Sequence, residues 1–328
     1  GGSTWGSATT GASVAISAEG TTLVQFRAVD GAGNASAWTP SSAGAGNTVK
    51  LDRTAPGTPT VSGGSLSWQS VASVTVTGSG ATDAGGSALS GYQYRWSTDA
   101  GGTWTGPVGG SSIAVNAEGE TLVQFRGVDN AGNTGPWAPS SATAGSTVRI
   151  DRTIPTDPTV SGGSLSWQSV PGITFTATGS SGGASGLGSY SYRTSTDNGS
   201  TWGSATSGGS VAVTAEGTTL VQFRAVDGAG NTGAWSPSSA TSGSTVKLDR
   251  TAPSAPTVSG GSSSWLSQAS TTVTASGSTD ATAGVSGYEY RTSTDGGSTW
   301  SAGTSGAAAT ITAEGETLVQ FRAVDVAG

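Results

Sequence analysis

Cysteine, methionine and histidine are all absent from the 328 residues of this chain. Without cysteine there is no disulfide and no thiolate chemistry, and without histidine there is no imidazole to act as a general base. Zinc sites built on these residues and Ser-His-Asp triads are therefore excluded. The lack of oxidisable cysteine and methionine is suited to prolonged exposure outside a cell.

Charge is also scarce, because only 10% of the residues are charged and the net charge is −7. There is no basic run that could displace counterions from nucleic acid. No apolar run approaches the ~20 residues needed to span a bilayer as a helix, and no signal-peptide pattern is visible. We therefore expect no nucleic-acid partner and no membrane span in this segment.

The chain does have a long internal repeat. The string AEG starts at Ala18, Ala117, Ala215 and Ala313, at spacings of 99, 98 and 98 residues, and LVQFR follows every copy. A repeat of this length exceeds the 20–50 residues of solenoid units and matches an independent β-sandwich of about 100 residues. The predicted domains are a partial repeat at 1–53, full repeats at 54–152 and 153–250, and a partial repeat at 251–328 that lacks its last strand.

The third repeat shows the strand pattern most clearly. About seven strands are predicted, at or near 158–162, 172–178, 190–196, 201–206, 210–215, 219–227 and 244–249. No segment has an apolar stripe of helical period, so the fold class is all-β, with tandem Ig-like or fibronectin-like sandwiches in a linear array. In the strand 219–227, Val221 and Phe223 alternate with Gln222 and Arg224, which predicts one buried face and one solvated face.

A short hairpin motif recurs once per repeat, as STDAGGTW at 97–104, STDNGSTW at 195–202 and STDGGSTW at 293–300. It resembles the Asp-box, a β-hairpin motif of sialidase-like propellers. The Asp is expected to accept hydrogen bonds from backbone amides just ahead of it, and the Trp to fold into the core. The predicted structural turn residues are Asp99, Trp104, Asp197, Trp202, Asp295 and Trp300.

The alternative for this motif is a glycosidase in which Asp197 acts beside a second carboxylate. Asp197 lies in a turn that recurs in successive domains, which favours a structural role. We therefore expect that the chain is not an enzyme and has no catalytic residue and no bound cofactor. A propeller would also need one motif per blade of ~40–50 residues, whereas this chain has one per repeat of about 98.

The whole repeat resembles the Ig-like repeats of large bacterial surface proteins. The likeness rests on an ordered set of motifs: a Trp, a strand, a variable loop, GYEYR, DGGSTW, AEGETLVQFRAVD, AGN and a closing LDRTAP. Repeat three departs from it, because SSGGASG replaces the loop that holds Asp83 and Asp280 in its neighbours. The resemblance implies extracellular tandem segments of a stalk or an adhesin, not an enzyme.

Recurrent acidic residues are candidate ligands for a calcium ion between domains, since Ca²⁺ takes six to eight oxygen ligands and several carboxylates must converge on one ion. The candidate ligands are Asp30, Asp52, Asp129, Asp151, Asp227 and Asp249, together with Asp325 and the glutamates of the AEG strings at 19, 118, 216 and 314. Against calcium, each link Asp at 52, 151 and 249 is followed by an Arg that could serve as its counter-charge. Sugar binding would need exposed aromatic platforms, for which Trp38, Trp137 and Trp235 are candidates, although packing within the domain or at a junction is the simpler role.

Residues 1–33 correspond to 296–328, so the chain starts and stops inside a domain. We expect either a window from a longer array or neighbouring copies that complete each other. The predicted function is a structural extracellular or cell-surface array, as a stalk, spacer or filament segment. Its partners would be neighbouring repeats of the same chain and other copies in a fibre. The alternatives are an adhesin that binds a glycan, a host surface or a protein, and accessory domains of a secreted glycosidase.

Overall fold

The computed structural model describes residues 4–328. The chain divides into two compact units, residues 1–153 and 154–328, which are described separately. Each unit contains one complete repeat, at 54–152 in the first unit and at 153–250 in the second.

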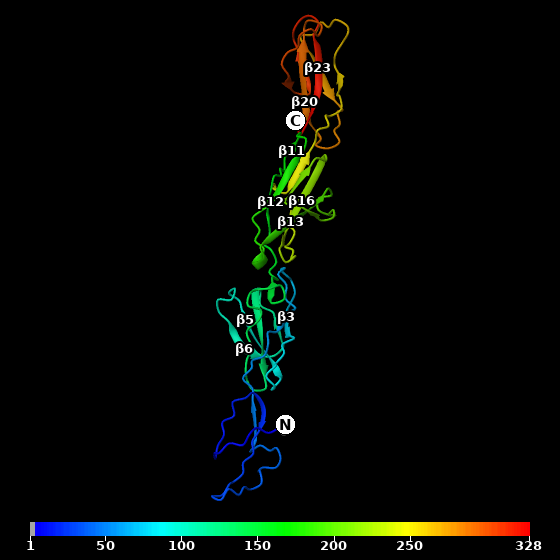
Figure 1. Ribbon diagram of the computed structural model, residues 1–328. Helices are drawn as coiled ribbons and strands as arrows, with labels where there is room; N and C mark the ends of the chain where they lie inside the picture. The colour runs from blue at the N-terminus through cyan, green and yellow to red at the C-terminus, as the bar shows by residue number, and fades with distance from the viewer. Residues whose placement is uncertain (1–3) are drawn as a thin grey trace. The chain divides into compact units, whose positions relative to one another are not determined.

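The first unit consists of nine strands in the described residues (Figure 1). They are β1 (Gly20–Leu23), β2 (Thr48–Leu51), β3 (Thr60–Ser62), β4 (Val74–Ser79), β5 (Leu89–Ser97), β6 (Thr105–Gly109), β7 (Ser112–Val115), β8 (Gly119–Asp129) and β9 (Thr147–Ile150). The complete repeat is built from two sheets, with strand orders β3-β4-β7 and β6-β5-β8-β9, while β1 pairs only with β2.

The second unit repeats this plan. Its strands are β10 (Thr159–Ser161), β11 (Trp167–Gln168), β12 (Ile173–Thr178), β13 (Leu187–Ser195), β14 (Thr206–Ser207), β15 (Ser210–Val213), β16 (Gly217–Asp227), β17 (Thr245–Leu248), β18 (Thr257–Ser259), β19 (Thr271–Ser276), β20 (Val285–Ser293), β21 (Thr304–Ser305), β22 (Ala308–Ile311) and β23 (Leu318–Asp325). The complete repeat has sheets β10-β12-β15 and β11-β17-β16-β13-β14, and the fourth has β18-β19-β22 and β21-β20-β23. A single 3-10 turn, η1 (Gly183–Ser185), lies between β12 and β13.

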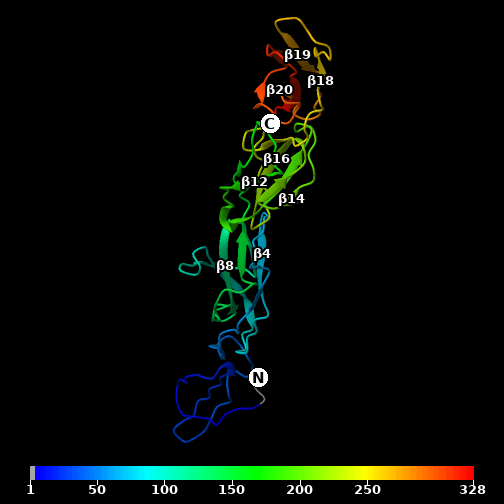
Figure 2. The same ribbon diagram turned by 90° about the horizontal axis from the view of Figure 1, so that it is seen from above.

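Alternating apolar residues from the two sheets form the core of each complete repeat. In the first unit β4 and β8 belong to different sheets and contact each other (Figure 2). Val76 from β4 packs there with Val123 and Phe125 from β8, and all three are fully buried. Phe175, Val221 and Phe223 fill the equivalent positions in the second unit. Because each complete repeat has its own core between its own sheets, the chain is a tandem array of β-sandwich domains, as predicted.

The predicted solvated face of the central strand is in fact covered. Gln124 on β8 is only 8% exposed and Gln222 on β16 only 7%, although both point away from the core. The prediction of a solvated face was therefore wrong for this strand, because large side chains lie over these glutamines. That cover is part of the candidate site described below.

The structure also adds a strand that the sequence pattern did not reveal. β11 is two residues long and pairs parallel to β17, with Trp167 opposite Lys247. The same tryptophan position is 88% exposed at Trp265 in the fourth repeat, where β23 pairs only with β20. Its burial thus depends on a neighbouring closing strand rather than on its own segment.

Candidate functional site

Alternating arginine and tryptophan side chains cover the outer face of the central sheet in each complete repeat. In the second repeat the guanidinium of Arg95 lies 4.5 Å from the ring centroid of Trp104 and 4.6 Å from that of Trp137. Arg126 stacks on Trp137 at 4.5 Å. We call this stack of two arginines and two tryptophans the Arg-Trp ladder.

The third repeat has the same ladder, made of Trp202, Arg193, Trp235 and Arg224, with distances of 4.5 to 4.6 Å. It forms because residues two apart on a strand point to the same face, so Arg193 on β13 and Arg224 on β16 both point outward. A planar guanidinium stacks on an indole face and gains cation–π attraction there. The ladder explains why Gln222 is buried on a face that alternation alone predicts to be wet.

The hairpin tryptophans belong to this ladder and not to the core. Trp104 and Trp202 are half-buried, and neither belongs to the core clusters of its repeat. The expectation that they fold into the core was wrong, because their rings lie on arginines of the outer sheet face. Trp300 in the fourth repeat likewise stacks on Arg291 at 4.8 Å.

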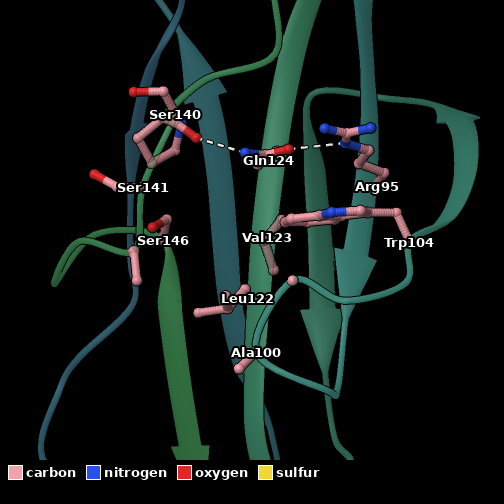
Figure 3. A pocket seen from close by; sticks show the side chains of 12 residues that line it. Arg95, Ala100, Trp104, Leu122, Val123, Gln124, Ser140, Ser141 and Ser146 are labelled. Atoms are coloured by element: carbon pink, nitrogen blue, oxygen red, sulfur yellow. Dashed lines mark hydrogen bonds between the residues drawn. The ribbon is translucent and has the colours of Figure 1, made fainter.

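A shallow groove lies beside the ladder in both complete repeats. In the second repeat it has a volume of about 340 Å³, and Gln124 at its wall accepts a hydrogen bond from Arg95 Nε and donates one to the carbonyl of Pro139 (Figure 3). The corresponding groove of the third repeat measures about 420 Å³. Neither lining includes an aspartate or a glutamate, so neither groove holds the pair of carboxylates that glycoside hydrolysis requires.

The ladder also includes two of the three candidate sugar platforms. Trp137 and Trp235 each have two guanidinium groups within 4.6 Å of the ring centroid, so a sugar would have to compete with arginine side chains for these rings. Trp38 is stacked by Arg27 at 4.7 Å and is 41% exposed. These tryptophans therefore pack within their own repeats on the outer sheet face.

The recurrent hairpin is held by a short network of side-chain hydrogen bonds. Asp197 Oδ1 accepts from Ser195 Oγ at 2.7 Å and from the amide of Thr201 at 2.9 Å, and Oδ2 accepts from Thr201 Oγ1. The Thr201 hydroxyl is the largest of the causes that lower the pKa of Asp197 to about 2. An aspartate held ionised inside a turn suits a structural role, since a catalytic acid needs a raised pKa.

The other two hairpins are built in the same way. Asp99 accepts from Ser97 Oγ and Thr103, and Asp295 accepts from Ser293 Oγ and Thr299. These contacts lower the pKa of each aspartate to about 2, chiefly through the Ser97 hydroxyl for Asp99 and the Thr299 hydroxyl for Asp295.

The arginines of the DRT links do not neutralise the aspartates beside them. Arg250 pairs with Glu216 at 3.3 Å, and Thr251 Oγ1 donates to the other oxygen of Glu216 at 2.9 Å. The same pairing joins Arg53 to Glu19 and Arg152 to Glu118. The expected counter-charge for the link aspartates was therefore wrong, because the AEG glutamates take the arginines.

Three carboxylates converge at one place in each unit. The first group is Asp52, Asp83 and Asp129, and the second is Asp249, Asp280 and Asp325. Within each group, one carboxylate oxygen from each residue lies within 4.8 Å of the other two. Each group joins two successive repeats, because its link aspartate closes one repeat and the other two aspartates belong to the next.

These groups only partly match the predicted calcium ligands. Asp52, Asp129, Asp249 and Asp325 were among the predicted residues, but Asp30, Asp151 and Asp227 belong to neither group found among residues 4–328. Asp83 and Asp280 complete the groups and were not among the predicted ligands. The loop aspartates Asp83 and Asp280 could have been found from the sequence, because each recurs in the loop before the strand that carries GYQYR or GYEYR.

Backbone amides hold several of these carboxylates in place. Asp52 Oδ2 accepts from the amide of Ser87 at 2.8 Å, and contacts with Ser87 are the largest cause of its lowered pKa. Asp280 Oδ1 accepts from the amides of Gly284 and Thr282, which lower its pKa in that order. The lowered pKa values of Asp52 and Asp280 keep these two carboxylates ionised at neutral pH.

Comparison with known proteins gives little beyond the fold. No family model matches the chain, and no curated protein matches it. A crystal structure of the FN1–FN3 domains of chicken CNTN1 is similar to it at 15% identity, covering 83% of this chain and 95% of that one, with a TM-score of 0.29. At that score the likeness carries no argument, so the β-sandwich assignment rests on the sheets and cores described above. Among residues 4–328 no helix has the length and apolar character needed to cross a membrane.

Proposed function

We propose that the chain is a structural extracellular array, a stalk, spacer or filament segment of a large bacterial surface protein. One observation carries this proposal: the same sandwich recurs with the same core, ladder and hairpin, so each repeat adds length without new chemistry. The residues that recur at fixed spacing are used for hydrogen bonds, stacking and packing inside their own repeats.

The closing links support a mechanical role. In the second unit Glu216 accepts hydrogen bonds from the amide and side chain of Arg250, and Arg250 also donates to the carbonyls of Pro171 and Thr214. These contacts fasten the last residues of repeat three to its own sandwich before the chain enters the next repeat. A link fixed in this way limits how freely the chain can bend between successive domains.

Deletion and duplication of one repeat test the proposal. Removing residues 153–250 joins repeat two directly to repeat four at a matching position, and duplicating the same residues is the matched control. If the chain is a spacer, the particle length seen by electron microscopy falls by about 35–45 Å with the deletion and rises by the same amount with the duplication. An unchanged length in both variants would contradict a spacer function.

A binding function is the second candidate, and the repeated groove favours it. Its walls combine Arg95, Trp104 and Gln124 with serines at 140, 141 and 146, and the third repeat has an equivalent set. This lining fits an adhesin that takes a polar ligand such as a glycan. A glycan screen with the whole chain tests it, and loss of any hit in the Gln124→Ala/Gln222→Ala double variant is the expected result.

A further inference from the structure

One position on the outer face of the central sheet carries a different residue in repeats two, three and four. This position lies directly across the sheet from the arginine of the long LVQFR strand. The pairs are Gln93 with Arg126, Ser191 with Arg224 and Glu289 with Arg322. The three repeats therefore place the same arginine next to an amide, a hydroxyl and a carboxylate.

Two of the repeats show what this arginine binds. In repeat four, Arg322 Nε and Nη2 both donate to Glu289 Oε2, at 2.9 and 2.7 Å. In repeat two, Arg126 makes the same two bonds to Gln93 Oε1, at 3.0 and 2.8 Å. One edge of the guanidinium, formed by Nε and Nη2, is thus a site for an oxygen acceptor, and a carboxylate is the strongest acceptor for it.

Repeat three does not supply an acceptor for the same edge. Arg224 Nε is buried and has no hydrogen-bond partner among the described residues. Ser191, which faces Arg224, has a shorter side chain than the glutamine or glutamate of the other repeats. A buried donor without an acceptor is costly, so the arginine edge of repeat three is poised to take an oxygen from outside the chain.

A second arginine adds to the positive charge at this place. The guanidinium groups of Arg193 and Arg224 lie 4.5 and 4.6 Å from the ring centroid of Trp235. The pKa of Arg193 is lowered, first by burial and then by the charge of Arg224. None of the ion pairs formed by residues 4–328 includes either arginine. Because Trp235 stacks on the guanidinium faces, their edges stay available for an anion.

The surroundings of the two arginines limit the kind of anion. The chain has a net charge of −7, which repels a polyanion and favours a ligand with one negative charge. Arg193 also lines the groove of repeat three, where Asn198, Ser238 and Ser239 present an amide and hydroxyl groups. Such groups donate and accept hydrogen bonds with sugar hydroxyls. One carboxylate combined with several hydroxyls is the chemistry of a uronic acid.

We propose that Arg224 binds the carboxylate of an acidic sugar, such as a uronic acid at the end of a glycan, through Nε and Nη2. The sugar carboxylate takes the place that the Glu289 carboxylate has in repeat four. Repeats two and four lack this site, because Gln93 and Glu289 occupy the same edge of their arginines. The inference deepens the second, binding function proposed above and does not depend on the spacer function.

The arginine Nε–H signals in NMR spectra of the full, ¹⁵N-labelled chain test the inference. Titration with galacturonic acid should shift the signal of Arg224 and leave those of Arg126 and Arg322 in place, and galactose, its neutral counterpart, should shift none of the three. Ser191→Glu supplies the carboxylate from within the repeat, so it should weaken binding about tenfold or more. Ser191→Ala is the matched control and should bind as the unchanged chain does.

Ser191→Gln provides a second variant with the same expected loss, since both replacements copy residues that other repeats carry at this position. The backbone amide signals of repeat three show in the same spectra whether each variant is folded. An unmoved Arg224 signal, or equal binding by Ser191→Glu and Ser191→Ala, would overturn the site.

Two further results would overturn the assignment to a sugar. One is that acetate binds as tightly as galacturonic acid. The other is self-association in sedimentation experiments that Ser191→Glu abolishes, because the carboxylate would then come from a second copy of the chain. None of these results affects the particle-length test of the spacer or the glycan screen with Gln124→Ala/Gln222→Ala, so the proposals can fail separately.

Discussion

Replacing Trp235 by leucine tests whether the Arg-Trp ladder stabilises the sandwich. Two guanidinium groups lie over the ring of Trp235, that of Arg193 at 4.5 Å and that of Arg224 at 4.6 Å from its centroid. Each contact contributes about 0.5–1 kcal/mol when exposed and about 2 kcal/mol when desolvated. Since the ring is half-buried, we expect Trp235→Leu to lower the local opening free energy by about 2 kcal/mol.

The full chain contains several cooperative units, so a single unfolding midpoint would not report on one repeat. Hydrogen exchange of the β16 amides measures local opening directly. A loss of about 2 kcal/mol corresponds to roughly 30-fold faster exchange. Arg224→Lys keeps the charge but not the planar stack, so it should give a smaller increase.

Trp265→Leu is the matched control for the ladder. Trp265 is 88% exposed and takes part in none of the cation–π contacts of the described residues. Its replacement should change the opening of its own repeat by no more than about 0.5 kcal/mol. Equal effects of Trp235→Leu and Trp265→Leu would refute the reasoning, because stacking between arginines would then contribute nothing.

Two further predictions concern the turns. Gly162→Ala should destabilise repeat three more than Gly217→Ala. Both glycines have positive φ, but only at Gly162 would a Cβ meet a carbonyl, that of Thr174 at 2.2 Å. Backbone strain alone costs about 1–3 kcal/mol, and equal acceleration of hydrogen exchange in the strands of repeat three by the two variants would contradict the argument. Asp197 has a pKa of about 2 in the folded protein, against 3.8 for an unperturbed aspartate. It therefore contributes hairpin stability that is fully present above pH 4 and is lost as the pH falls towards 2. Its carboxyl ¹³C shift should therefore titrate near pH 2, whereas a midpoint near 4 would show that the Ser195 and Thr201 contacts are not formed.

Most strands of the third repeat could be predicted because period-2 alternation and turn residues mark them directly. The strand 219–227 appears as β16 at Gly217–Asp227, and Val221 and Phe223 are fully buried as predicted. β11 was missed because its two residues carry no pattern of their own. That strand exists only through its pairing with β17, which lies about 80 residues further along the chain.

The errors at the candidate site have a common physical cause, because each concerns a partner distant in sequence. Alternation shows that Gln222 points away from the core, but it does not show that tryptophans from a hairpin and from a later loop cover it. Similarly, Arg250 follows Asp249 in sequence, yet Glu216 accepts its hydrogen bonds. The loop aspartates Asp83 and Asp280 became candidates only when the fold brought them to a link and to the end of a long strand.

Stretching single molecules of the full chain tests most directly whether each complete repeat is a separate cooperative unit. A repeat of 98 residues extends to about 350 Å when unfolded, from about 40 Å when folded, so each complete repeat should release about 310 Å in one step. Two such steps of equal size, one from residues 54–152 and one from 153–250, are the predicted result. One step of about twice that length, or extension without discrete steps, would contradict an array of independently closed sandwiches.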